Sequence, residues 1–166
     1  MIFKNYYPYT ISLYLILGVI YAWYKLLLDF GLGYLVLAPV PAALFVLVSI
    51  YFFYAGVNGL LSKGKYKSYQ LQSIALLMQA FQFSFMGIVY ANYAGPYVGV
   101  GFYFLSNTTF DVQLSIYQFL FSNGYSNNAE PYFFLNLFPL LLWLLYYCFH
   151  ANREDKIISP NGDVHS

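Results

Sequence analysis

The chain alternates between long apolar stretches and short charged segments. No Asp, Glu, Lys or Arg occurs in four windows of the sequence, which cover residues 5–24, 30–62, 68–110 and 131–152. A helix needs about 20 mostly apolar residues to cross the hydrocarbon core of a bilayer, and each window can hold one crossing. The pattern therefore predicts four transmembrane helices, at about residues 10–28, 41–61, 69–94 and 131–150.

Glycines and prolines mark where these helices begin and end. Gly31 and Gly33 supply a turn after the first helix. The second helix is expected to begin near Pro41, because a proline is tolerated in a first turn, where its missing N–H would have no partner. A start near Tyr34 with a kink at the prolines is the alternative. For the fourth helix, a bend at Pro139 stays open.

One stretch has a different period. From Phe110 to Ile116 apolar residues alternate with Asp111, Gln113 and Ser115, which is the spacing of a half-buried strand. We predict a β-hairpin over residues 98–105 and 110–119, within an outer loop at 95–130, with "SNTT" as its turn. Its apolar face is expected to pack on the outer end of the bundle or on the headgroup layer, because an open sheet edge cannot lie in the lipid core. An interfacial helix or an ordered aromatic loop are the alternatives.

Composition supports a membrane protein. Only 8% of the 166 residues are charged, against about 25% in typical globular domains, and 61% are hydrophobic. So few charges cannot cover a soluble protein with a hydrated surface. The predicted fold class is an all-α membrane protein, a four-helix transmembrane bundle in one domain at residues 1–150, followed by a short polar tail at 151–166.

Lysines and arginines predict the orientation. Lys63, Lys65 and Lys67 lie between the second and third helices, while Lys4 precedes the first helix and Arg153 follows the fourth. An even number of crossings places all of them on one side, which the positive-inside rule makes cytoplasmic. The prediction is a multi-pass protein of the cell membrane with both termini in the cytoplasm.

Polar residues inside the predicted helices are the candidate functional residues, because lipid makes them costly. Gln72, Gln79 and Gln82 fall near one face of the third helix. Tyr54 and Asn58 lie at helical spacing on the second helix. This face could line a pocket, but glutamines more often hold helices together by hydrogen bonds, and we favour that interpretation.

A possible charged pair lies at the end of the first helix. Lys25 and Asp29 are four residues apart, so they can pair if the helix continues that far. Lys25 could form a site for an anionic headgroup or a coupled ion. The simpler interpretation is that it reaches the outer interface and pairs locally.

Several function classes find no support in the sequence. The net charge of +1 does not indicate nucleic acid as a partner. A single cysteine and two histidines near the C-terminus provide no metal-ligand pattern, and no motif indicates a cofactor. Asn107 begins a glycosylation sequon that matters only in a eukaryotic secretory route. No catalytic constellation suggests an enzyme, although an enzyme acting on a lipid stays the third interpretation.

The function expected from these features is a non-catalytic accessory or interaction subunit of a membrane assembly. Its partners would be the lipid bilayer and another membrane protein or a second copy of the chain. The alternative is a carrier or binding protein for a small apolar or lipid-like molecule held within the bundle.

Overall fold

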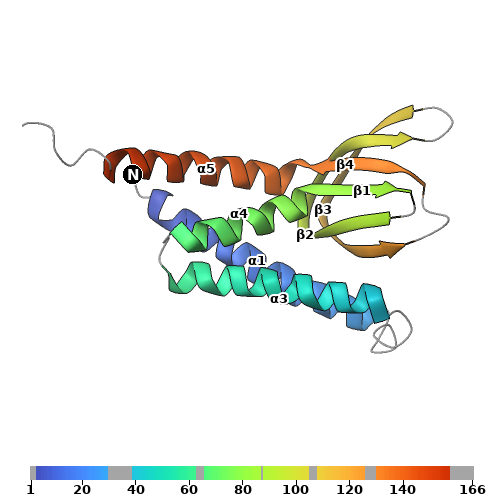
Figure 1. Cartoon of the computed structure of the whole chain (residues 1–166), viewed down its shortest axis with the longest axis horizontal. Helices are drawn as coiled ribbons and strands as arrows, with labels where there is room; N and C mark the ends of the chain where they lie inside the picture. The colour runs from blue at the N-terminus through green and yellow to red at the C-terminus, as the bar shows by residue number, and fades with distance from the viewer. Residues whose placement is uncertain are drawn as a thin grey trace, which may run out of the picture.

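The computed structural model describes residues 3–29, 39–62, 66–86, 88–104, 108–125 and 130–157. Within these ranges the chain forms four helices and a four-stranded antiparallel sheet, with the sheet at one end of the helices (Figure 1). The helices are α1 (Phe3–Asp29), α3 (Pro39–Leu61), α4 (Tyr66–Ala80) and α5 (Leu137–Ile157). The strands are β1 (Phe81–Phe85), β2 (Ile88–Phe104), β3 (Thr108–Tyr125) and β4 (Tyr132–Asn136).

The first two predicted helices are present. α1 begins seven residues before the predicted start at Thr10 and contains Pro8, and α3 begins at Pro39, as expected for a proline in a first turn. Both are long and apolar enough to cross a membrane, by length and composition alone, over Tyr6–Leu28 and Ala42–Leu61. Among the described residues, α5 contributes only a shorter apolar segment, Leu137–Cys148.

The prediction of an all-α four-helix transmembrane bundle is wrong. The predicted third helix, 69–94, ends at Ala80, and β1 follows without an intervening loop. β1 has the sequence Phe-Gln-Phe-Ser-Phe, with the phenylalanines exposed and Gln82 and Ser84 buried. Pairing with two neighbouring strands satisfies its backbone, so the period of two prevails over the helical one. Met86 then adopts a positive φ of 49° in the turn to β2.

The predicted fourth helix, 131–150, is also a strand followed by a helix. Asn136 ends β4, and its Oδ1 accepts a hydrogen bond of 3.2 Å from the N–H of Phe138. This is the geometry of a helix N-cap. Pro139 therefore lies in the first turn of α5 and causes no bend in mid-helix. α5 continues to Ile157, so the first residues of the predicted polar tail are helical, and residues 158–166 lie outside the described part.

The predicted hairpin is confirmed and is larger than expected. β2 and β3 pair along nearly their whole length, with Val98 opposite Leu114 and Phe102 opposite Phe110. The interfacial helix and the aromatic loop are therefore ruled out for the described residues, because 95–104 and 108–125 are strand rather than loop. Of the predicted turn at residues 106–109, Thr108 and Thr109 belong to β3 and not to a turn. Ser106 and Asn107, which begins the sequon, lie outside the described residues.

The hairpin is sharply bent at Gly95. The β2–β3 register shifts between Gly95 and Tyr97, and Gly95 has a φ of +139°, which an L side chain rarely adopts. A Cβ here would also lie 2.9 Å from the ring of Tyr14. The bend folds the hairpin back on itself, and β1 and β4 lie between its two arms (Figure 1).

The two central strands close this sheet. β1 pairs with the first half of β2, where Gln82 lies opposite Ala91, and β4 pairs with the second half, where Gly101 lies opposite Phe134. β1 and β4 also pair with each other. Each central strand is joined to a helix without a loop: β1 follows α4 directly, and α5 follows β4 directly.

Four helix ends lie at one end of the molecule, as the predicted orientation of the chain requires. The start of α1, the end of α3, the start of α4 and the end of α5 all lie at the end of the molecule opposite the sheet (Figure 1). Lys67 is exposed there, at the start of α4, whereas Lys63 and Lys65 lie outside the described residues. The main apolar core lies between the helices and contains Ile11, Leu15, Val19, Phe52, Ala55, Ala75, Leu76 and Tyr146.

Candidate functional site

The sheet has its apolar side chains outside and its polar ones inside. On β3, Phe110 is 62% exposed and Leu114 is 75% exposed, whereas Asp111 and Gln113 are partly buried. The prediction that this apolar face packs on the bundle is therefore wrong. The reason is hydrogen bonding on the inner face, where Gln113 Nε2 donates to the Tyr103 hydroxyl at 3.1 Å and to Asp111 at 3.0 Å.

Three glutamines form a buried polar column through the molecule. Gln72 and Gln79 lie on α4, whereas Gln82 lies on β1 and not on a helix as predicted. None of the three is more than 3% exposed. The Oε1 atom of each accepts a hydrogen bond from a tyrosine hydroxyl of a different element. The donors are Tyr146 of α5 for Gln72, Tyr14 of α1 for Gln79 at 2.9 Å, and Tyr97 of β2 for Gln82 at 3.4 Å.

Gln72 joins four helices. Its Nε2 donates to Ser12 Oγ at 2.7 Å and to the Pro8 carbonyl oxygen at 3.3 Å, both on α1, while its Oε1 accepts from Tyr146 on α5. On α3, Gly59 faces this cluster so closely that a Cβ would overlap Gln72 Nε2 and Ser12 Oγ. The column is therefore closed by direct contacts, as expected of glutamines that hold a bundle together.

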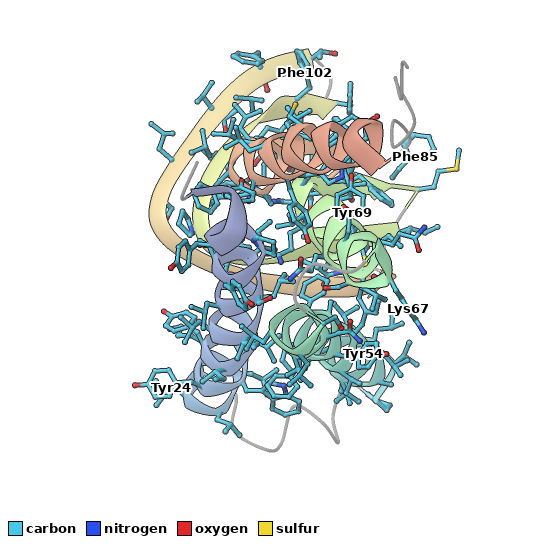
Figure 2. The ribbon with its side chains drawn as sticks, turned by 90° about the vertical axis from the view of Figure 1, so that its left-hand side faces the viewer. Tyr24, Tyr54, Lys67, Tyr69, Phe85 and Phe102 are labelled. Atoms are coloured by element: carbon cyan, nitrogen blue, oxygen red, sulfur yellow. The ribbon has the colours of Figure 1, made fainter. Side chains whose placement is uncertain are left out.

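The remaining predicted residues do not join this column. Asn58 accepts a hydrogen bond of 2.8 Å from the hydroxyl of Ser62, the residue that follows the end of α3. Tyr54 points to the outside of the molecule, as Figure 2 shows, and is 49% exposed. Lys25 is partly buried. The Asp29 side chain lies outside the described ones, so the Lys25–Asp29 pair stays a prediction.

An apolar groove runs between α1 and α3. Its volume is about 680 Å³. The residues that line it are Val19, Ile20 and Trp23 of α1 and Ser49, Ile50, Phe53, Tyr54 and Val57 of α3. Of these, sequence reasoning selected only Tyr54. Residues 50, 53, 54 and 57 have the i, i+3, i+4, i+7 spacing of one helical face, and this signal could have identified the α3 wall.

Burial perturbs one tyrosine of the column. The pKa of Tyr97 is raised to about 12, chiefly by burial; the hydrogen bond to Gln82 acts in the opposite direction, and the nearby Tyr103, Tyr132 and Asp111 add smaller upward contributions. The hydroxyl of Tyr97 therefore stays protonated, and donates to Gln82, over the whole neutral range.

A pH titration should detect this tyrosine. The pKa of Tyr97 in the folded protein lies above the ordinary tyrosine value of 10.0, so the stability linked to Tyr97 is complete below pH 10 and is lost as the pH rises towards 12. Tyr97→Phe should remove one group from the late step of tyrosinate absorbance. The late step should disappear when the protein is unfolded in denaturant, and a Tyr97→Phe titration identical to the wild type would contradict the assignment.

Within the described ranges, no group of three or more His, Cys, Asp or Glu side chains lies close enough to hold a metal ion. No protein-family model matches the chain, and no curated protein or solved structure matches it. Two features of the molecule bear on its function, the polar column and the apolar exterior with its groove.

Proposed function

We propose that this protein is a non-catalytic membrane protein that acts by binding other membrane components, as an accessory or interaction subunit. The observation that carries the proposal is the apolar exterior, which surrounds an apolar core and the buried glutamine column. Large apolar side chains are exposed on helices and sheet alike. They include Leu13, Leu17, Ile20, Leu44, Leu47 and Ile50 on α1 and α3, Leu141, Leu144 and Leu145 on α5, and Phe102, Phe104, Phe110, Val112 and Leu114 on the sheet.

Such an exterior is too apolar for contact with water alone. Soluble monomers rarely expose contiguous apolar patches of more than a few hundred Å². Here the exposed apolar side chains extend from the helices to the sheet, where Phe102 points outward at the opposite end of the view from Tyr54 (Figure 2). We place the protein in the cell membrane, multi-pass, with α1 and α3 as crossing helices and with the chain ends on the cytoplasmic side.

The polar column favours a structural role for the glutamines. Gln79 is 2% exposed and already accepts the hydroxyl of Tyr14, so a ligand at this face would have to break that contact. This argues against the alternative of a molecule held against the glutamines within the bundle. It leaves the outside of the molecule as the surface available for binding.

Site-specific photo-crosslinking in intact cells tests the proposal. A photoreactive phenylalanine is placed at Leu17, Leu47 or Leu114, all strongly exposed, and at Leu76, which is fully buried. We expect at least one exposed position to give a discrete protein adduct, and mass spectrometry of that band identifies a partner or a second copy. The reason is that a surface used for protein binding holds its partner within reach of the reactive group.

Leu76 is the control, since a buried position should give no intermolecular adduct. If all three exposed positions form adducts with lipid alone, the interaction role is wrong. Extraction of the protein by an alkaline wash of the membranes would contradict the membrane location itself.

A further inference from the structure

We propose that the groove between α1 and α3 binds a neutral, lipid-like molecule with a hydrocarbon body and one uncharged polar group, such as a hydroxyl or an ester carbonyl. The inference rests on the proposed function in one respect, because the groove opens onto the apolar exterior. It adds a defined site and a ligand class to that surface.

The dimensions of the groove favour a small molecule over a partner helix. Its volume of about 680 Å³ lies within the roughly 300–1,000 Å³ that is usual for small-molecule sites. Its α3 wall extends from Ser49 to Val57, which is about 12 Å at 1.5 Å per residue. A partner helix crossing the bilayer would need a contact surface along about 30 Å.

The walls of the groove exclude a charged ligand. Its lining contains no Lys, Arg, Asp or Glu, so the headgroup of an anionic or cationic lipid would lose its hydration without gaining a partner. A hydrocarbon chain has no hydrogen bonds with water to lose when it packs against Val19, Ile50 and Phe53. A neutral molecule is therefore the class that this lining accepts.

Ser49 supplies one specific polar contact. It lines the groove and is 2% exposed, and its Oγ has no hydrogen-bond partner among the described residues. A buried hydroxyl without a partner is costly. Rotation of χ1 between staggered positions turns Oγ towards a ligand, where it can donate to a carbonyl or hydroxyl oxygen. Ser49 lies at one end of the α3 wall, which extends to Val57, so the polar group of the ligand lies at that end of the groove.

Aromatic packing holds the site in shape. Trp23 packs edge-on against Phe45 with ring centroids 5.0 Å apart, in a second buried cluster that also contains Ala22 and Leu26. Close by, α1 and α3 approach so tightly at Gly56 that a Cβ there would lie 2.7 Å from Ile16. The groove is therefore formed before a ligand arrives, which lowers the cost of binding.

Trp23 makes the proposal testable by fluorescence. The chain has two tryptophans, so Trp143→Phe leaves Trp23 as the only emitter. The probe is brominated monoolein, whose bromines quench tryptophan on contact and whose ester and hydroxyls supply neutral polar groups. Titrated into the full-length protein in detergent micelles, it should quench Trp23 saturably, with one molecule bound per chain.

Two double variants distinguish ligand binding in the groove from binding to the rest of the apolar surface. Ile20→Phe with Ile50→Phe narrows the groove and should weaken binding at least tenfold. Leu17→Phe with Leu47→Phe adds the same bulk at equally exposed positions of the same helices that do not line the groove, and should leave binding unchanged. Quenching that does not saturate, or that is equal in both double variants, would overturn the site.

Ser49→Ala tests the polar contact, and its nearly unchanged volume keeps the test valid if the double variants do not fold. It should weaken brominated monoolein binding about fivefold, as expected for one neutral hydrogen bond, without affecting dibromooctadecane, which has no polar group. Equal effects on both probes would contradict the role of Ser49. Neither outcome depends on the crosslinking result, so the two proposals can fail separately.

Discussion

Gly101→Ala is expected to detach β4 from β2 and to destabilise the whole sheet. A Cβ at this position would overlap the carbonyl oxygen of Phe133 and would lie 2.7 Å from the Cα of Phe134. These are backbone atoms of the neighbouring strand, so no side-chain rotation relieves the contact. We expect a loss of about 3 kcal/mol in the free energy of unfolding, at the upper end of the usual cost of overpacking, measured by denaturant titration in mixed micelles.

Gly99→Ala is the matched control two residues away on the same strand. The three atoms nearest to its Cβ would all belong to the side chain of Tyr97 and none to the backbone; a side chain can shift where a paired strand cannot, so the loss should be smaller. The interpretation of the β2–β4 contact fails if Gly101→Ala unfolds at the wild-type denaturant concentration, or if Gly99→Ala proves the more damaging of the two.

Gln72→Leu is expected to destabilise the protein by removing the hydrogen bonds that join α4 to α1 and α5. Leucine is of similar size but cannot accept the Tyr146 hydroxyl or donate to Ser12 and Pro8. A buried donor that loses its acceptor costs about 1–3 kcal/mol, and we expect a loss of about 2 kcal/mol in the free energy of unfolding. The same mixed-micelle titration, followed by circular dichroism, measures it.

Gln70→Leu gives the comparison on the same helix. Gln70 is exposed, so the substitution makes the same chemical change without removing a buried contact, and stability should change by less than about 0.5 kcal/mol. Equal effects of the two substitutions would mean that the column does not hold the helices together.

The elements that could be predicted from the sequence are those whose hydrophobic pattern fits only one kind of secondary structure. The windows that became α1 and α3 are long, apolar and bounded by charges, and no strand of that length fits a compact protein. The alternation from Phe110 to Ile116 was equally clear and led to the β2–β3 hairpin. Both cases depend on local periodicity, which a single sequence shows directly.

The break after Ala80 could not be predicted in the same way. Gln79 and Gln82 are three residues apart, which fits a helix, and no glycine, proline or charge separates α4 from β1. Pairing with β4, about fifty residues later, decides the strand, and such a distant contact leaves no local mark. For α5 a signal was present, because Asn136 three residues before Pro139 is typical of a helix N-terminus.

The orientation of the sheet was missed for a different reason. A period of two shows that a strand has two faces but does not show which face is buried. In water the apolar face would turn inward. Here the inner face is occupied by Tyr97, by glycines that allow β4 to approach, and by bonded polar groups, so the apolar face turns outward. The candidate glutamines lie together in the buried column, with Gln82 on a strand and not on the predicted helix, whereas the groove was missed apart from Tyr54.

The position of β4 has a consequence for biosynthesis. β1, β2 and β3 are synthesised in succession, and they can pair with one another as each emerges from the ribosome. β4 then arrives last and must insert between β1 and the second half of β2. A ribosome stalled before residue 132 would therefore leave a nascent chain whose sheet lacks a central strand, so the final closure of the sheet waits until β4 has emerged.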